Sequence, residues 1–388
     1  MKILHTSDLH LGHSLYEFDR QEEQEAMLSQ IIEIAQSHQP DAVVISGDIF
    51  HSAQPPAWAQ TIFANAMLRL AEACPETAII ATAGNHDSAV RHEIFRSPWQ
   101  ALRVHALGTL HKDTPDDHII PLPGEGCIVA MPYVGQRNLP EGFCQQLLER
   151  AAELTQEGLP IVMMAHTAVG GCDFKGHDNP TEYSVGGIEY MKLEDLGTGY
   201  DYLALGHIHR RQTIKGSQGK ARYCGTPLPV SFDEAYPHSV DIVTLPAAGT
   251  KPEIEEVAIL TSRPLVNLPA EGFADFDEAL RLLAEFPDDN PAYVRLNVEV
   301  DNFLPATAQA DATRIAESKA CRYCGINSRR KERDKEKTHS FSVREFQSAA
   351  PVDIALKYAN DLGMAFDDEM QNMFEEAVRS LDEDQRNN

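Results

Sequence analysis

The chain has 388 residues, 43% of them hydrophobic, which suffices for about two or three folded domains and excludes a disordered or collagen-like protein. Its apolar runs are far shorter than the roughly 18 residues of a membrane helix, and polar residues interrupt the N-terminus before a signal peptide could form. Seven scattered cysteines argue against a disulfide framework, so we expect a soluble intracellular protein.

The charge balance is strongly acidic. Lys and Arg number 33 against 59 Asp and Glu, which gives a formal net charge of −26. Because neutralisation of phosphates dominates affinity for nucleic acids, the total charge argues against DNA or RNA as a partner. A metal site or a local basic patch would reverse that conclusion for one surface of the molecule.

Short apolar runs alternate with helical stretches in the first half of the chain. Helices are predicted over residues 20–37 and 55–73, where apolar residues recur at helical spacing or a Pro-Pro pair opens the run. The expected strands are residues 2–6, 42–46, 77–83, 127–131, 161–165 and 201–205. This alternation predicts a mainly parallel sheet with helices on both faces.

Near residue 210 the pattern changes to short strands that are close together in the sequence, at residues 212–215, 221–224, 240–244 and 254–260. A second unit then has the predicted order strand, helix, strand, helix, strand, at residues 264–268, 273–285, 292–299, 306–318 and 320–328. We therefore predict a first domain over residues 1–262, a small α/β domain over 263–328, a charged linker over 329–340 and amphipathic helices over 341–388.

Polar side chains follow five of the predicted strands, at the point where each strand ends. These residues are Asp8 and His10; Asp48; Asn85, His86 and Asp87; His166; and His207 and His209. In open α/β sheets, binding sites form in the crevice outside the carboxyl ends of the strands. Any one of these motifs alone could be a turn or a surface histidine, but five strand ends of this kind predict one shared site.

The ligand set of this site contains oxygen and nitrogen and no thiolate. It suits Mn²⁺, Fe or Zn²⁺ and is too rich in imidazole for a Ca²⁺ cage. Asp8, His10, Asp48, Asn85, His166, His207 and His209 are too many ligands for one ion and enough for two, with Asp48 as the natural bridge. Two divalent ions roughly 3.5–4 Å apart suit a phosphate ester, so the residues predict a two-metal phosphoesterase.

The five motifs resemble those of the calcineurin-like metallophosphoesterase superfamily. Serine/threonine phosphatases of that superfamily carry arginines where this chain has Ile49-Phe50 and Ala83. The segments ILHTSDLHLGHSLY, SGDIFHSAQPP, AGNHDS, DYLALGHIHRRQ and RYCGTPLPVSFDE instead resemble the SbcD family, the nuclease subunits of bacterial SbcCD complexes and relatives of double-strand-break repair nucleases. The resemblance covers most of residues 1–245.

For the fold, this resemblance implies an α/β metallophosphoesterase sandwich of mixed sheets flanked by helices. A small α/β capping domain, which binds DNA, and C-terminal helices would complete the chain, in the bacterial cytoplasm. For the site, it implies two divalent ions, most often Mn²⁺. Asp8, His10, Asp48 and His209 would hold one ion, and Asp48, Asn85, His166 and His207 the other.

The resemblance also suggests catalytic roles for three further residues. His86 matches the catalytic histidine, placed to protonate or stabilise the leaving oxygen. Asp87 would orient that imidazole or only close the turn. His51 matches a second active-site histidine, with a catalytic or a DNA-positioning role.

Basic residues concentrate in two stretches beside the predicted site and on the second domain. The candidates for contact with DNA are Arg210, Arg211, Arg329, Arg330, Lys331 and Arg333, although residues 329–337 could instead form a solvated charged face. Cys321 and Cys324 form a single CxxC, for which a structural role is favoured over zinc or redox chemistry.

At the C-terminus, an apolar stripe at helical spacing comprises Met370, Met373, Phe374, Ala377 and Leu381, and Ile354, Tyr358 and Leu362 form another. Such stripes are usually core, but Met-rich faces also suit partner binding. The SbcD resemblance implies that these helices dock on the coiled-coil base of an SbcC-like ATPase, within a heterotetramer that contains a homodimer of this chain.

We therefore predict a metal-dependent DNA nuclease subunit that works in DNA end processing, repair, recombination and replication. By resemblance it is a 3′→5′ double-strand exonuclease and an endonuclease on hairpins and single strands. A small-molecule phosphodiesterase or phosphatase of the same superfamily is the first alternative, but it leaves about 125 residues after Thr261 without a role. A structural DNA-end tether, with metals serving only the fold, is the second.

Overall fold

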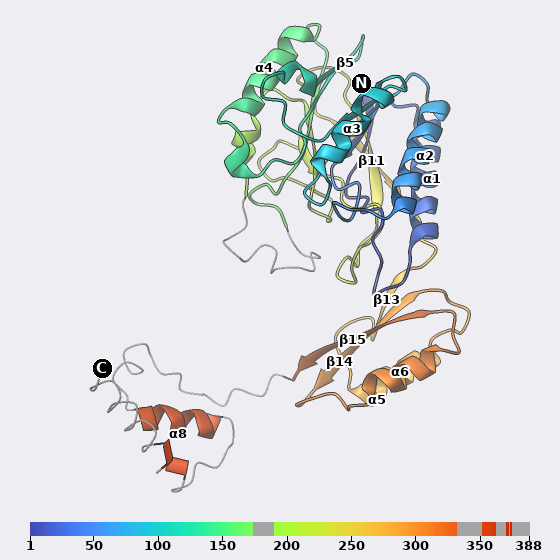
Figure 1. The fold of residues 1–388 in the computed structure, drawn as a ribbon, viewed down its shortest axis with the longest axis vertical. Coiled ribbons are helices and arrows are strands. Elements are labelled where there is room, and N and C mark those ends of the chain that lie inside the picture. Colours follow the sequence, from blue (N-terminus) through green and yellow to red (C-terminus); the bar gives the residue numbers. More distant parts are fainter. Residues whose placement is uncertain (174–189, 332–350, 362–369, 372, 375–388) are drawn as a thin grey trace. The chain divides into compact units, whose positions relative to one another are not determined.

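The computed structural model describes residues 1–173, 190–331, 351–361, 370–371 and 373–374 (Figure 1). Two compact units divide the chain, Met1–Arg329 and Arg330–Asn388. The first unit contains two six-stranded sheets and one three-stranded sheet. We call residues 263–330, which carry the three-stranded sheet, the capping region.

The first six-stranded sheet has the order β12-β11-β1-β2-β3-β4. Its strands are β1 (Lys2–Thr6), β2 (Ala42–Ser46), β3 (Ala78–Thr82), β4 (Val104–Leu107), β11 (Ser239–Thr244) and β12 (Glu253–Ala258). The strands β1 to β4 are parallel, whereas β11 is antiparallel to both β1 and β12. The carboxyl ends of β1, β2 and β3 therefore lie next to one another.

The second six-stranded sheet has the order β5-β6-β7-β8-β10-β9. Its strands are β5 (Ile119–Leu122), β6 (Gly126–Ala130), β7 (Ile161–His166), β8 (Tyr202–Gly206), β9 (Gln212–Thr213) and β10 (Ala221–Tyr223). The strands β6, β7, β8 and β10 are parallel, and the two edge strands are antiparallel to their neighbours.

The two sheets face each other across a shared apolar core. Ile3, Val44 and Ile80 of the first sheet belong to one buried cluster with Ile128, Val162 and Tyr202 of the second. The predicted cover of helices on both faces of a mainly parallel sheet is therefore wrong, and the sandwich of mixed sheets flanked by helices is confirmed. A strand covered by a helix and a second sheet has the same apolar pattern as one covered by two helices, so the pattern did not separate them.

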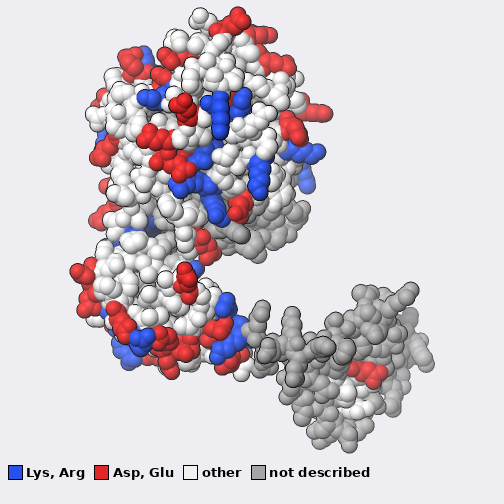
Figure 2. Space-filling model, turned by 180° about the vertical axis from the view of Figure 1, so that it is seen from behind, with Lys and Arg blue, Asp and Glu red and all other residues white. Residues whose placement is uncertain are grey.

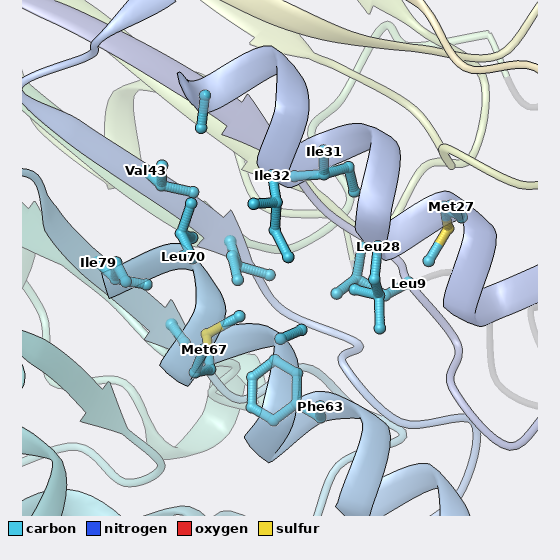
Figure 3. Packing of buried hydrophobic residues seen from close by; sticks show 14 of the residues in the cluster. Leu9, Met27, Leu28, Ile31, Ile32, Val43, Phe63, Met67, Leu70 and Ile79 are labelled. Carbon is cyan, nitrogen blue, oxygen red and sulfur yellow. The ribbon is translucent and has the colours of Figure 1, made fainter. Parts of the chain in front are cut away.

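Helices cover the outer faces of the sandwich. The helices α1 (Gln21–His38) and α2 (Ala57–Ala73) lie side by side on the first sheet, and α4 (Phe143–Leu154) packs on the second (Figure 1). Figure 3 shows Leu28, Ile31 and Ile32 of α1 beside Phe63, Met67 and Leu70 of α2, over Val43 and Ile79. The remaining elements of this part are α3 (Ala89–Gln100) and the short 3₁₀ helices Pro115–His118, Gln136–Asn138 and Leu193–Leu196.

Every strand and helix predicted for residues 1–262 has a counterpart in the structure, with ends that agree within a few residues. The elements α3, β4, β5 and α4 had no prediction. For α4 a signal was present, because Phe143, Leu147, Leu148 and Ala151 follow helical spacing and are buried. The helix α3 contains Pro98, and the side chains that the structure describes in it form no buried apolar stripe of that kind, so the signal for it in the sequence is weak.

The capping region has a sheet of order β13-β14-β15, with helices α5 and α6 packed on one face (Figure 1). Its elements are β13 (Leu265–Leu268), α5 (Phe276–Glu285), β14 (Tyr293–Val300), α6 (Ala308–Ala316) and β15 (Arg322–Arg330). The predicted order of strands and helices is confirmed. Cys321 packs in the core beneath the helices and Cys324 in a different cluster with Leu15 and Phe232, which supports a structural role for each cysteine.

In the second unit the structure describes the helix α8 (Pro351–Asp361) and helical backbone at residues 370, 371, 373 and 374. Met370 and Met373 are exposed, by 48% and 67%. The predicted linker beyond residue 331, together with Leu362, Ala377 and Leu381, lies outside the described residues. None of the helices within the described ranges is long and apolar enough to span a bilayer.

Candidate metal centre

Both six-stranded sheets contribute to the site, because the predicted ligands follow the carboxyl ends of central strands in each. Asp8 and His10 follow β1, Asp48 follows β2, and Asn85 follows β3. His166 is the last residue of β7, and His207 and His209 follow β8. The fold thus brings all seven predicted ligands to one place.

Four of these residues have left-handed backbone conformations. The φ angles are 53° at Asp8, 44° at His10, 48° at Asp48 and 98° at His207. Such conformations cost about 1–3 kcal/mol each and persist only where surrounding contacts enforce them. Backbone hydrogen bonds do so here, since the Asp8 amide donates to the Gly47 carbonyl and the His10 amide to the Asp48 carbonyl, each at 3.0 Å.

Asp8, His10 and His209 form the first ligand group. One potential ligand atom from each lies within 4.8 Å of the others, and the Nε2 atoms of His10 and His209 are 3.1 Å apart. His209 Nδ1 donates to the Glu234 carboxylate, so its Nε2 carries the lone pair. Two imidazoles that meet in this way around a buried carboxylate fit a cation held between them.

Asp48, His166 and His207 form the second ligand group, again with atoms within 4.8 Å of one another. The Asn85 side-chain oxygen lies 2.9 Å from His207 Nδ1 and 3.0 Å from His166 Nε2, which adds the amide to this group. Asp48 Oδ2 is 3.3 Å from His166 Nε2 and 3.9 Å from His10 Nε2. Asp48 thus lies between the two groups, at the position of a bridging ligand.

Two glycines allow the strand ends to approach this closely. A Cβ atom on Gly84 would lie 2.1 Å from Asp48 Oδ1, and one on Gly47 would lie 2.1 Å from His166 Nδ1. Because such contacts are far inside van der Waals distance, only glycine fits at either position. These glycines shape the site although they offer it no side chain.

Burial and charge set the protonation of the ligands. Burial opposes the charged form of His166, but the Asp48 carboxylate outweighs it and raises the pKa of His166 to about 9. Burial lowers the pKa of His10 well below its usual value, and it raises the pKa of the Asp8 carboxyl. Divalent ions placed among these groups would favour ionised carboxylates and neutral imidazoles, which is the form that binds metals.

The imidazole of His86 lies beside the first ligand group. His10, His51 and His86 each offer a nitrogen within 4.8 Å of the others, and the His51 and His86 rings are stacked with centroids 5.7 Å apart. His86 Nδ1 donates to the His51 carbonyl at 2.9 Å, which leaves Nε2 for other partners. The His86 amide donates to Asp48 Oδ1 at 2.9 Å.

Asp87 closes the turn after β3. Its carboxylate accepts from the backbone amides of Ile49, Phe50 and Gly84 at 2.8–3.0 Å. Of the two roles considered for Asp87, these contacts support closure of the turn, because the His51 carbonyl is the group that holds His86 Nδ1. Asp87 therefore fixes the backbone from which Asp48 and His86 project.

Glu234 is the residue that sequence reasoning missed. It is 3% exposed and accepts from His209 Nδ1 at 2.9 Å and from the Thr226 hydroxyl at 2.8 Å. A carboxylate on the far nitrogen of a metal-binding histidine fixes its tautomer and raises its basicity. The signal in the sequence was its place as the last residue of the segment RYCGTPLPVSFDE, which resembles the SbcD family but follows no strand end that carries a ligand.

The predicted DNA contacts are only partly described. Arg210 pairs with Asp173, Arg211 with Glu256 and Arg329 with Glu299, each at 3.0 Å. Arg330 and Lys331 are exposed at the end of β15, and Arg333 lies outside the described residues. On the face in Figure 2, Lys and Arg side chains gather in the middle of the large unit with Asp and Glu around them, so a negative total charge leaves room for a locally basic surface.

Comparison with known proteins identifies the class. Residues 1–211 match the family model of the calcineurin-like phosphoesterases, so the chain belongs to that family.

Individual relatives narrow the assignment within that family. The SbcD component of nuclease SbcCD from Rhodobacter capsulatus is 32% identical over 312 residues, 73% of this chain and 75% of that protein. The corresponding protein of Bacillus subtilis is 32% identical over 323 residues, 78% and 80% of the two chains.

The corresponding SbcCD component of Escherichia coli K12 is 29% identical over 325 residues, 78% of this chain and 79% of that protein. Within the phosphoesterases, the chain thus belongs to the SbcD family of nucleases. The resemblance of the five motifs to that family is confirmed.

Proposed function

We propose that this chain is the nuclease subunit of a DNA end-processing complex, with 3′→5′ exonuclease activity on double-stranded ends and endonuclease activity on hairpins and single strands. The position of Asp48 between two complete ligand groups carries this proposal, because it matches what hydrolysis of a phosphodiester by two ions needs. The oxygen and imidazole ligands suit Mn²⁺, Fe or Zn²⁺, and the resemblance to the SbcD family favours Mn²⁺ among them. The pair would be held by Asp8, His10, Asp48, Asn85, His166, His207 and His209.

Two bound divalent ions would supply Lewis acidity and positive charge at the phosphate, and the chain's own residues would complete the reaction. The His51 carbonyl orients the His86 ring, so that Nε2 can hold the proton that the 3′-oxygen needs when it leaves. Proton transfer of this kind contributes typically about 10²–10⁴-fold. His51 stacks on His86 and would position either that ring or the DNA.

Labelled DNA tests the proposal directly. Blunt duplex and hairpin substrates are incubated with Mn²⁺ or Mg²⁺, with and without the ATPase partner. We expect Mn²⁺-dependent shortening of the duplex from its 3′ ends and opening of the hairpin, both extended by the partner. Rapid turnover of cyclic nucleotides with intact DNA would favour a small-molecule phosphodiesterase instead, and end binding without cleavage would favour a tether.

The partner of this chain would be an SbcC-like coiled-coil ATPase bound through the C-terminal helices. The relatives are named as subunits of an SbcCD nuclease, which supports a partner subunit for this chain as well, and the family resemblance makes that subunit an ATPase. The exposed Met370 and Met373 give the second unit an apolar surface suited to a partner helix.

A homodimer within the heterotetramer is supported by the surface of α2 and α3. Leu68, Val90 and Ile94 are 45%, 69% and 64% exposed there. They lie on the two helices that line an apolar pocket with walls from Phe63 and Trp99. Exposed apolar residues on helices that line an apolar pocket fit contact with a second copy of the chain.

Replacement of Ile94 by arginine tests this surface. We expect Ile94→Arg to convert a dimer into a monomer of 43.0 kDa, because a charge buried in an apolar interface without a partner is not compensated. Light scattering after size-exclusion chromatography gives the mass. Leu154→Arg on α4, where leucine is 49% exposed, is the matched control and should leave the mass unchanged. An unchanged mass in Ile94→Arg would place the dimer interface elsewhere.

A further inference from the structure

The capping region contacts the phosphoesterase part of the same unit through two short segments. One runs from Leu15 to the beginning of α1, and the other is the segment of residues 232–234. In each segment, one residue bonds to the capping region and the next residue in sequence supports the first ligand group. These two pairs of neighbours are Glu23 with Gln24 and Asp233 with Glu234.

In the segment of residues 232–234, all three side chains are engaged. The guanidinium of Arg295, on β14, lies 4.6 Å from the centre of the Phe232 ring and 3.3 Å from Asp233 Oδ1. The next residue, Glu234, accepts the hydrogen bond from His209 Nδ1. A shift of β14 that moves Asp233 therefore moves the group that orients His209.

At the beginning of α1 the arrangement is the same. The Tyr293 hydroxyl, also on β14, donates to Glu23 Oε1 at 2.6 Å. The next residue, Gln24, is 1% exposed and holds the loop that carries His10. Its side-chain oxygen accepts from the Gly12 amide at 2.9 Å, and its nitrogen donates to the His13 carbonyl at 3.2 Å.

The second ligand group is held by the sheets instead. His166 Nδ1 donates to the Ser46 carbonyl at 2.8 Å, and the Ser46 hydroxyl donates to the Ala204 carbonyl at 3.1 Å. These atoms belong to the buried strands β2, β7 and β8, at the centre of the sandwich. The support of this group is therefore part of the rigid core.

We propose that the position of the capping region sets the metal affinity of the first ligand group, while the second ligand group is insensitive to it. This inference rests on the proposed function in so far as the two groups hold ions. Adjacent residues of a helix turn or a short buried segment move together, so a contact made by one is transmitted to the other. By linkage, an ion on the first ligand group stabilises the docked capping region to the same extent.

Titration of the metal-free protein with Mn²⁺, followed by calorimetry and by electron paramagnetic resonance, tests this coupling without DNA. Tyr293→Phe removes one oxygen atom, and Arg295→Ala removes the contacts to Phe232 and Asp233. We expect either variant to weaken one of two Mn²⁺ sites by up to about 10-fold, the lower limit for loss of a direct support of a ligand. When Mn²⁺ is limiting, the variants should therefore show the paramagnetic resonance signal of a single bound Mn²⁺ ion in place of the signal of two coupled ions.

Two ligand variants identify the weakened site. In a His166→Ala background the remaining ion sits on the first ligand group, so Arg295→Ala should weaken it. In a His209→Ala background Arg295→Ala should change nothing. Arg281→Ala, on the exposed face of α5 with ion pairs to Glu278 and Glu285, is the matched control within the capping region and should leave both sites unaltered.

Equal weakening in the two backgrounds, or unaltered binding in both Tyr293→Phe and Arg295→Ala, would overturn the coupling. Thermal melts test whether each variant is folded. If Arg295→Ala is unfolded, Tyr293→Phe alone tests the coupling. Failure of the wild-type protein to cleave DNA would refute the proposed function. It would leave the coupling between the capping region and the first ligand group untouched, because that test measures Mn²⁺ binding alone.

Discussion

Asp48→Ala is expected to abolish metal-dependent cleavage. The Asp48 carboxylate is 2% exposed and lies within 4 Å of imidazole nitrogens from both ligand groups, so its removal takes a ligand from each ion. Loss of one stabilising group in an active site costs about 10²–10³-fold, and loss of a bridge should exceed that range. Mn²⁺ binding by calorimetry and DNA cleavage would be measured on the same preparation.

Asp48→Asn separates the effect of the negative charge of Asp48 from the effect of its shape, since asparagine keeps one side-chain oxygen at the same place. We expect it to bind Mn²⁺ more weakly than wild type and to cleave slowly. Asp116→Ala is the matched control, because Asp116 forms an exposed ion pair with Arg150 and is not one of the predicted ligands. Undiminished cleavage by Asp48→Ala would rule out a two-ion mechanism at this site.

His86→Ala is expected to retain both ions and lose turnover by about 10²–10⁴-fold, which is the usual contribution of a proton donor. The His86 Nδ1 atom is occupied by the His51 carbonyl, so Nε2 is the atom that would face the leaving oxygen. Metal content is measured after gel filtration and turnover on duplex DNA. His38→Ala, at the end of α1, is the matched control.

A substrate with a good leaving group distinguishes proton donation from other roles. A nitrophenyl phosphodiester releases an anion that needs no proton, so His86→Ala should cleave it nearly as fast as wild type. Equal losses on DNA and on this substrate would contradict proton donation by His86. Loss of an ion from His86→Ala would instead make His86 a ligand, which its nitrogen near those of His10 and His51 would allow.

The ligands were predictable because strand ends are readable from sequence. Buried strands such as β2 and β7 consist of an unbroken apolar run, and the polar residues that end or follow each run mark the carboxyl end of the strand. Since parallel strands end at the same edge, Asp8, Asp48 and His166 could be placed together without knowing that the chain forms two sheets. The arrangement of those sheets required the family resemblance.

The supports of the ligands were not predictable. Glu234 meets His209, and Gln24 holds the His10 loop, through tertiary contacts that follow no period in the sequence. The same holds for Arg210 and Arg211, which were expected to face phosphate and which pair with Asp173 and Glu256. Their contact with DNA and the predicted domain boundaries stay predictions.

The glycines of the site have a consequence for mutational scans of this family. A scan reports that a position is intolerant, and intolerance is commonly taken as a sign of chemistry. Here a methyl group on Gly84 would collide with Asp48, and one on Gly206 would lie 1.9 Å from the Ser46 carbonyl. Such positions should tolerate substitution as poorly as the ligands do, so an inactive alanine variant at a strand end reports lack of space as readily as a lost reactive group.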